Sequence, residues 1–293
     1  MQKTQLHLWF DKEAGEALAF YTTLFPDSAI RFQSVIHNTP SGDCDVYQFT
    51  LAGLSFQALN GGPAFQINAS VSLSVMCETA DEVDALHQAL VKGGSELMPL
   101  GEYPFCKRYA WVKDRFGLTW QLMLTDTPIT QKIIPTLLFS GSQSGRAEDA
   151  IRQYADLLPG SSVDFVSHYK EGEAHNPAAR VNYALFTLAD TVYAAMDNGT
   201  FDEEPFSEAV SIIVNCGGQA EIDRLWEALS QVPEAEACGW LKDSHGLSWQ
   251  IVPEDFDSLA LDKQGEYDPG VMQAVMDMKK LDIEELRRAR PNK

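Results

Sequence analysis

The sequence predicts an α+β fold in which two similar copies follow one another, each made of two consecutive βαβββ units, with a helical tail at the end. The main observation is an internal repeat: residues 111–121 (WVKDRFGLTWQ) and 240–250 (WLKDSHGLSWQ) share seven of eleven positions. Shorter blocks recur in the same order, such as LFPDS at 24–28 and LLPGS at 157–161. The copies lie about 130 residues apart, far above the period of solenoid repeats, so each should be a domain.

The first unit of the first copy is read from its hydrophobic spacing. Residues 13–25 carry apolar side chains at helical intervals and are followed by Pro26, which cannot continue a helix. Short apolar runs predict strands at residues 4–10, 30–36, 45–52 and 54–59, with Gly53 in a turn.

The second unit repeats this order. Residues 71–76 predict a strand, and residues 79–91 a helix with Thr79 or Asp81 as its N-cap and two glycines as its stop. Residues 95–123 supply further strands that end in a hairpin around residues 114–117. The second copy has matching helices near 145–158 and 218–229, and a shorter segment before its final hairpin.

The domain boundaries follow from the repeat. We expect the first domain at residues 1–126, the second at 132–254 and a helical tail at 255–293, with a polar link containing Pro128 between the copies. In the tail, Asp268 precedes apolar residues at helical spacing from 271 to 281, and a second short helix can begin at Asp282. We expect the tail to pack on the domains; the alternative is a partner-binding helix.

Composition excludes several classes of protein. Apolar residues make up 45% of the 293 residues, enough for a core, which excludes global disorder. There are 42 acidic and 22 basic residues, and the net charge of −20 should repel nucleic acid and anionic membranes. Five cysteines without a CxxC pair indicate a reducing compartment. With neither a signal-like start nor a long apolar run, we expect a soluble, cytoplasmic protein.

The motifs resemble those of a known family. They are Leu8-Trp9-Phe10-Asp11, Leu24-Phe25-Pro26, Leu59-Asn60-Gly61-Gly62-Pro63, Met196-Asp197-Asn198-Gly199 and the repeated Trp-to-Gln hairpins. This set resembles the PhnB-like branch of the vicinal-oxygen-chelate superfamily, a branch labelled 3-demethylubiquinone-9 3-methyltransferase. The superfamily includes glyoxalase I, extradiol dioxygenases and the bleomycin- and fosfomycin-resistance proteins. The resemblance implies two glyoxalase-like domains with cupped mixed sheets, packed as an internal pseudo-dimer in a monomer or weak homo-oligomer.

The resemblance also places the superfamily's metal-ligand positions on this chain. They fall at Thr4 and Ile133, at Ser72 and Ser211, and at Gln121 and Gln250. None is a histidine or carboxylate, and neutral hydroxyls and amides hold a transition metal weakly, so we predict no metal and no cofactor. His7 lies on a cavity-lining strand, yet Thr136 replaces it in the second copy. We therefore expect a histidine at a strand edge, with metal ligation as the alternative.

Signatures of catalysis are weak. A class I methyltransferase needs a glycine-rich turn inside a parallel α/β sheet, and residues 141–145 (GSQSG) are better explained as a loop before a helix, so we judge the methyltransferase label unlikely. Asp114 and Asp243 open Asp-x-x-Gly turns, which favours capping of the turn over a general base. Cys238 has no histidine next to it in sequence and is expected to be a small buried thiol.

A repeated polar and aromatic set remains. Trp120 and Trp249 alternate with Gln121 and Gln250, so if the glutamines point into the cups the tryptophans pack behind them. We expect two convergent groups of ligand-binding residues, each drawn from one copy. They are Trp9, Asn60, Trp111 and Gln121 in the first copy, and Leu138, Asp197, Trp240 and Gln250 in the second. Such groups suit a planar or apolar small molecule. The alternative is that the tryptophans only fill the core.

Three functions compete. The first is a metal-free protein that binds or sequesters a small molecule, with only one of two diverged cups active. The second is an enzyme of unknown reaction that uses a residue such as Asp197 or a weakly held metal. The third is a scaffold whose tail recruits a partner.

Overall fold

The computed structural model describes residues 2–290, which form four successive βα units and a tail. The first repeat contains β1 (Thr4–Phe10), α1 (Ala14–Tyr21), β2 (Ala29–Thr39), β3 (Gly42–Leu51), β4 (Leu54–Asn60), β5 (Val71–Cys77), α2 (Ala80–Leu90), β6 (Ser95–Tyr103), β7 (Cys106–Lys113) and β8 (Thr119–Leu124). The second contains β9 (Ile133–Phe139), the 3₁₀ turn η1 (Gly141–Gln143), α3 (Ala147–Leu157), β10 (Ser162–His168), β11 (Val181–Leu188), β12 (Thr191–Asp197), β13 (Val210–Cys216), α4 (Gln219–Leu229), the 3₁₀ turn η2 (Pro233–Ala235), β14 (Trp240–Lys242) and β15 (Ser248–Pro253). The tail contains α5 (Phe256–Ala260), α6 (Pro269–Asp277) and α7 (Ile283–Ala289).

The predicted order of elements is confirmed, and the differences lie at their ends. The predicted helix over 13–25 ends at Tyr21, because the chain turns where the Thr22 hydroxyl donates to the Leu18 carbonyl. Thr79 caps α2 as expected, its hydroxyl accepting from the Glu82 amide at 3.2 Å. The apolar run over 271–281 is not one helix, since α6 ends at Asp277, and α5 was not predicted. The fourth unit has one strand fewer than the others, as its short connection suggested.

Each of the two sheets takes one unit from each repeat. Sheet A has the order β14-β15-β13-β1-β4-β3-β2, and sheet B the order β10-β11-β12-β9-β5-β8-β7-β6. At their centres β1 pairs antiparallel with β13, and β5 pairs antiparallel with β9. Strand pairing thus crosses between the two domains expected at residues 1–126 and 132–254.

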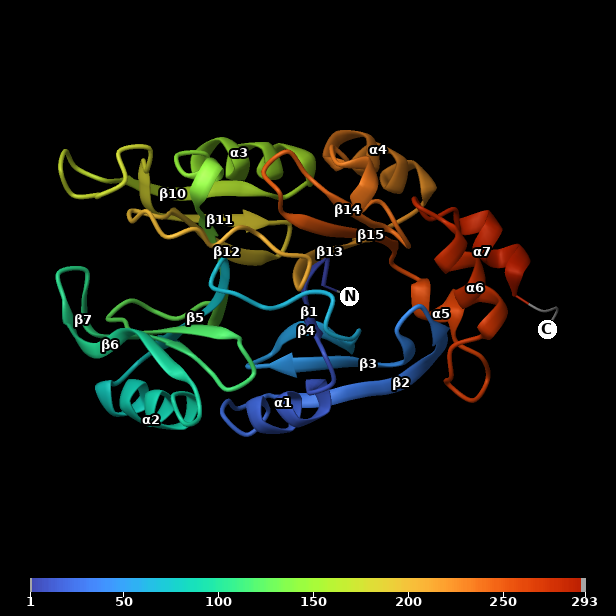
Figure 1. The fold of residues 1–293 in the computed structure, drawn as a ribbon, viewed down its shortest axis with the longest axis horizontal. Helices are drawn as coiled ribbons and strands as arrows, with labels where there is room; N and C mark the ends of the chain where they lie inside the picture. The colour runs from blue at the N-terminus through green and yellow to red at the C-terminus, as the bar shows by residue number, and fades with distance from the viewer. Residues whose placement is uncertain (1, 291–293) are drawn as a thin grey trace.

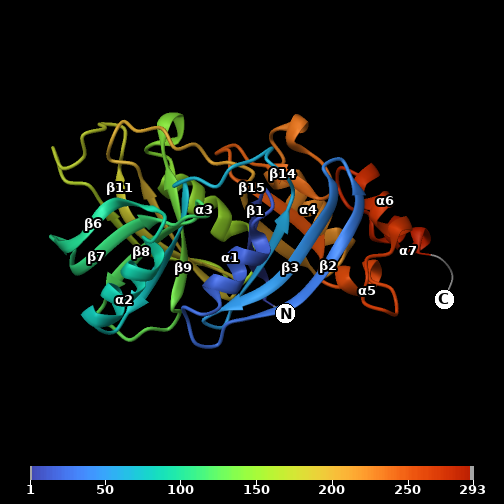
Figure 2. The ribbon, with the colours of Figure 1, turned by 60° about the horizontal axis from the view of Figure 1, so that its bottom comes forward.

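Both sheets are curved, with helices on their outer faces (Figures 1 and 2). Helices α1 and α4 pack on sheet A, and α2 and α3 on sheet B. The tail lies at the far end of sheet A, where α6 contacts β2 and the Ser34 hydroxyl donates to Glu266 at 2.8 Å. The tail packs on the sheets as expected: Val271, Leu281 and Leu286 are buried. Within residues 2–290, no helix is long and apolar enough to span a membrane.

A buried aspartate joins the two units of each repeat. In the first repeat, Asp114 accepts hydrogen bonds from the Tyr21 hydroxyl of α1 at 2.7 Å and the Trp120 indole of β8 at 2.8 Å. Its other oxygen accepts from the backbone amides of residues 116 and 118. Burial raises the pKa of the Asp114 carboxyl, and the four hydrogen bonds oppose that rise. The turn-capping role predicted for this aspartate is therefore confirmed and extended to two aromatic donors.

The second repeat has the same arrangement. Asp243 accepts from the Tyr154 hydroxyl at 2.7 Å, from the Trp249 indole at 2.9 Å and from the amides of residues 245 and 247. Both tryptophans are buried behind their strands, as predicted if the adjacent glutamines face the cups. Each aspartate ties a helix of one sheet to a hairpin of the other, so the duplicated contact holds the two sheets together.

We predict that Asp114→Ala and Asp243→Ala each lower the free energy of unfolding by at least about 3 kcal/mol, because each leaves four buried donors without an acceptor. Urea unfolding followed by tryptophan fluorescence measures this change. The exposed Asp126→Ala serves as control and should change stability by less than about 0.5 kcal/mol. A loss below about 1 kcal/mol for either buried aspartate would contradict the role given to it here.

Candidate functional site

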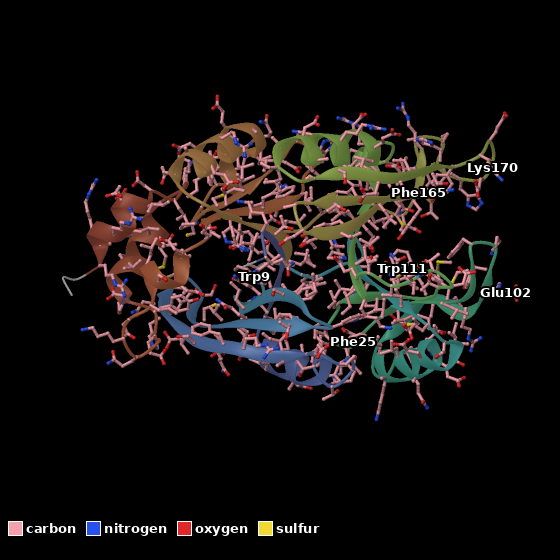
Figure 3. All side chains as sticks on the ribbon, turned by 180° about the vertical axis from the view of Figure 1, so that it is seen from behind. Trp9, Phe25, Glu102, Trp111, Phe165 and Lys170 are labelled. Carbon is pink, nitrogen blue, oxygen red and sulfur yellow. The ribbon has the colours of Figure 1, made fainter. Side chains whose placement is uncertain are left out.

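A cavity of about 350 Å³ lies between the concave face of sheet A and the tail. Strands from both repeats form its floor and walls, and tail residues form its roof. Its lining includes Gln5, His7, Trp9, Gln57, Trp240 and Gln250 from the sheet, and Phe256, Tyr267 and Met272 from the tail. Trp9 lies near the middle of the molecule and Trp111 further along towards the sheet-B end (Figure 3).

Strand alternation decides which side chains reach the cavity. On β1, Gln5, His7 and Trp9 line it, while Leu6 and Leu8 are buried in the core. The alternation of side chains along β1 corrects one of the expected metal-ligand positions. Thr4 has the opposite phase and does not line the cavity; its hydroxyl accepts from Tyr193 at 3.1 Å. His7 pairs in register with Ser211 and is the β1 residue at that level.

His7 is a neutral, unpaired imidazole. It is 3% exposed, and burial lowers its pKa to about 3. Its ring stands edge-on to Trp240, with ring centroids 5.2 Å apart. Its Nδ1 is buried without a hydrogen-bond partner in residues 2–290. An unsatisfied buried polar atom is costly, so a partner outside the protein chain is indicated.

The side chains beside His7 do not form a ligand set that fits a divalent transition metal. His7 pairs in register with Gln57 on one side and Ser211 on the other, and Gln250 donates to the Ser211 hydroxyl at 3.0 Å. One neutral imidazole among amides and a hydroxyl lacks the anionic ligands that such sites use. In the part of the chain that the structure describes, no three His, Cys, Asp or Glu side chains are grouped as metal ligands would be.

The expected division of site residues by repeat is wrong. Trp9 of the first repeat lies in the sheet-A cavity with Trp240 and Gln250 of the second, and the two indole rings are 6.4 Å apart. Trp111 and Gln121 lie on sheet B, directly opposite each other on β7 and β8. The reason is topological: β1 pairs with β13 rather than with β5, so each cup mixes the two repeats.

On sheet B, the polar side chains around Gln121 form hydrogen bonds with one another. Tyr109 donates to the Gln121 carbonyl oxygen at 2.9 Å, and the Gln121 amide donates to Ser72 at 2.7 Å. The hydroxyls of Ser74 and Thr136 bond each other at 2.7 Å. Gln121 is thus occupied at both ends, whereas Gln250 in sheet A makes its bond through Nε2 alone among residues 2–290.

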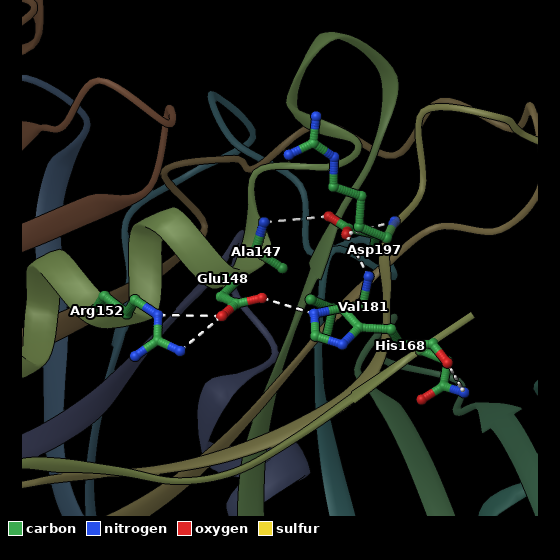
Figure 4. Close-up of polar contacts among 8 residues, drawn as sticks. Ala147, Glu148, Arg152, His168, Val181 and Asp197 are labelled. Carbon is green, nitrogen blue, oxygen red and sulfur yellow. Dashed lines mark hydrogen bonds and ion pairs between the residues drawn. The ribbon is translucent and has the colours of Figure 1, made fainter. Parts of the chain in front are cut away.

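Asn60 and Asp197 occupy matching places and hold loops rather than line the cavity. The Asn60 carbonyl oxygen accepts from the Ala14 amide at the start of α1. Asp197 is fully buried and accepts from four backbone amides, those of residues 145, 147, 180 and 181, at 2.8–3.1 Å. Figure 4 shows this carboxylate beside Ala147 and Val181, near the surface cluster of Glu148, Arg152 and His168.

Sequence reasoning missed several lining residues. Gln5, Gln48, Gln57 and Asn215 face the cavity from four strands, and strand alternation in phase with Trp9 would have found Gln5. The tail residues that form the roof could not be found in this way, because the tail lies outside the repeat and contributes no strand. Cys238, expected to be buried, is half-buried at the cavity wall, and burial raises the pKa of its thiol.

Comparison with known proteins identifies the family. The model of the family described as 3-demethylubiquinone-9 3-methyltransferase matches residues 2–123 and again residues 131–252. The chain belongs to this family. The two matches confirm the duplication and the PhnB-like relationship within the vicinal-oxygen-chelate superfamily. No curated protein matches this family member.

One solved structure agrees with the duplicated glyoxalase-like fold, and two shorter proteins are similar in sequence. Glyoxalase I from Zea mays is 13% identical, with 86% of this chain and 94% of that chain covered and a TM-score of 0.55. The PhnB protein from Bacillus cereus is 38% identical over 42% of this chain and 100% of its own, with a TM-score of 0.40. A Staphylococcus aureus protein is 31% identical over 42% of this chain and 97% of its own, with a TM-score of 0.18.

We predict that His7 contributes to loss of stability in acid. Its folded pKa of about 3 lies below the ordinary value of 6.5, so the unfolded chain takes up a proton that the folded chain does not. Stability should therefore fall as pH falls from 6.5, by up to about 3 kcal/mol at pH 4 from this group alone. Urea unfolding of wild type and His7→Gln across this range measures the difference.

The variant should lose less stability on acidification than wild type. The exposed His175→Gln serves as a matched control and should follow the wild-type curve. Parallel curves for wild type and His7→Gln would contradict a buried, neutral His7.

Proposed function

We propose that this family member is a metal-independent protein that binds or sequesters a small molecule in the sheet-A cavity. The observation that carries the proposal is the cavity itself: about 350 Å³, lined by Trp9, Trp240, Gln250 and an unpaired His7. Ligand sites are concave and mostly apolar, with a few placed polar groups, and this cavity has that composition. The donor set supports a site without metal.

Binding at only one cup is supported by a difference between the two glutamines in the hydrogen bonds that they make within the chain. Gln121 is satisfied by Tyr109 and Ser72, while Gln250 keeps its carbonyl oxygen at the cavity wall. We therefore propose that sheet A carries the ligand and that sheet B serves mainly as its packing partner. The exchange of units between the sheets further supports an internal pseudo-dimer, with a single chain as the functional unit.

Three other roles have less support. As a methyltransferase, the chain would need a glycine-rich turn in a parallel sheet, whereas residues 141–145 here contain the short 3₁₀ turn η1 beside a sheet of mixed strand direction. An enzyme that used His7 as a general base would need that imidazole to take up a proton near neutral pH, and a pKa of about 3 makes it a poor base. A scaffold role is weakened because the apolar residues of the tail are buried.

We predict that gently purified protein carries an organic molecule that native mass spectrometry detects on a single chain. Gln250→Met, which keeps the side-chain length but removes the amide, should weaken binding about 5- to 10-fold, the effect of one lost hydrogen bond, and so lower the occupied fraction. The matched Gln121→Met should leave occupancy unchanged, because that glutamine bonds only within the protein.

Equal losses in the two variants would contradict binding at one cup. An added mass that disappears with a chelator would contradict metal independence. Wild-type protein that never carries an organic mass would contradict a sequestering role.

A further inference from the structure

A band of uncharged polar side chains crosses the floor of the sheet-A cavity. Gln48 on β3 pairs in register with Gln57 on β4, which pairs with His7 on β1, which pairs with Ser211 on β13. Gln250 on β15 extends the band by its hydrogen bond to Ser211. A band that runs across five strands presents a row of hydrogen-bonding groups to one edge or face of a ligand.

Only part of this hydrogen-bonding capacity is used within the chain. Gln250 donates to Ser211, and the Gln48 amide donates to Asp257 at 2.9 Å. The Gln57 amide makes a long 3.4 Å contact with Gln5. His7, which is 97% buried, makes no side-chain hydrogen bond with residues 2–290 and lines the cavity. The band thus retains both donors and acceptors for a ligand, because an amide and a neutral imidazole each offer both.

The charged groups at the cavity have one sign. No lysine or arginine of residues 2–290 lines it, and the charged lining residues are Glu254 and Asp257. An anionic ligand would lose hydration on entry and meet two carboxylates without a cation to compensate. Since His7 has a pKa of about 3, it supplies no positive charge near neutral pH.

Aromatic side chains in the walls and roof determine the shape of the cavity. Trp9 and Trp240 stand at 83° to each other, and Phe65 packs edge-on against Trp9 at 5.0 Å. From the tail, Phe256 and Tyr267 close the opposite side. Aromatic walls stack best on flat ring systems.

We infer that the cavity selects an uncharged, flat heterocycle whose edge carries both hydrogen-bond donors and acceptors, and that it rejects anions. This inference rests on the proposed function and names the ligand class of the same site. The sheet-B cup should lack this preference. At its matching register positions it has Leu185 and Ala194 where sheet A has Gln48 and Gln57, and Thr136 where sheet A has His7.

Three flat tricyclic probes of similar outline test the inference by tryptophan quenching and calorimetry at pH 8. Lumiflavin is uncharged and has an imide edge with a donor and acceptors. The same ring system bearing a carboxymethyl group adds one negative charge. Acridine keeps three fused rings but has a single ring nitrogen. Lumiflavin should bind at least about 10-fold more tightly than either of the others, the factor that corresponds to about 1.4 kcal/mol.

Variants locate the preference in the polar band. His7→Phe, and Gln57→Met as a milder second variant, should each weaken lumiflavin binding about 5- to 10-fold, as expected for one lost hydrogen bond, and should not weaken acridine binding. Thr136→Val is the matched control in sheet B and should change the binding of neither lumiflavin nor acridine.

The carboxymethyl probe binding as tightly as lumiflavin would overturn the exclusion of anions. Acridine binding as tightly as lumiflavin would overturn the role of the polar edge, while leaving a ligand-binding cavity in place. If no probe binds, the ligand class proposed here fails; the proposed function fails separately, if wild-type protein also carries no organic mass in the native spectrum.

Discussion

Two buried carboxylates hold the architecture together. Asp114 and Asp243 each gather a tyrosine hydroxyl, an indole N–H and two backbone amides, and each does so at the contact between a helix on one sheet and a hairpin of the other. Because every donor at these points is buried, the tyrosine, the tryptophan and the turn can be accommodated only together. Asp243 directly follows β14, which carries Trp240 and pairs with Gln250, so this contact also helps to position part of the cavity wall.

The cavity depends equally on the pairing of units from different repeats. Trp9 and Trp240 meet only because β1 lies beside β13, and the tail that covers them follows β15 directly. The site therefore draws on both ends of the chain and on a segment outside the duplication. This explains why the tail covers the sheet-A cup, while the sheet-B cup is filled only by side chains of its own sheet.

Much of the fold could be predicted from the sequence, because repeat, hydrophobic spacing and capping are local signals. Thr79 caps the helix that it was expected to cap. Asp268 and Asp282 cap the two tail helices that were expected to begin next to them. The site was harder to predict from the sequence. Trp9, Trp240 and Gln250 do line a cavity, but their grouping follows from strand pairing between repeats, which no local pattern encodes. Asn60 and Asp197 look like site residues in sequence, yet they bind backbone amides, a role that only the loop geometry reveals.

The joining of two repeats in one chain has a consequence for symmetry. A homodimer built from identical chains has two identical cups, since any substitution appears in both. Here the corresponding positions carry His7 and Thr136, or Gln57 and Ala194, so the two-fold relation survives in the backbone and is broken in the side chains. Covalent linkage thus permits a division of labour that a symmetric assembly cannot have: one cup can change its chemistry while the other preserves the scaffold.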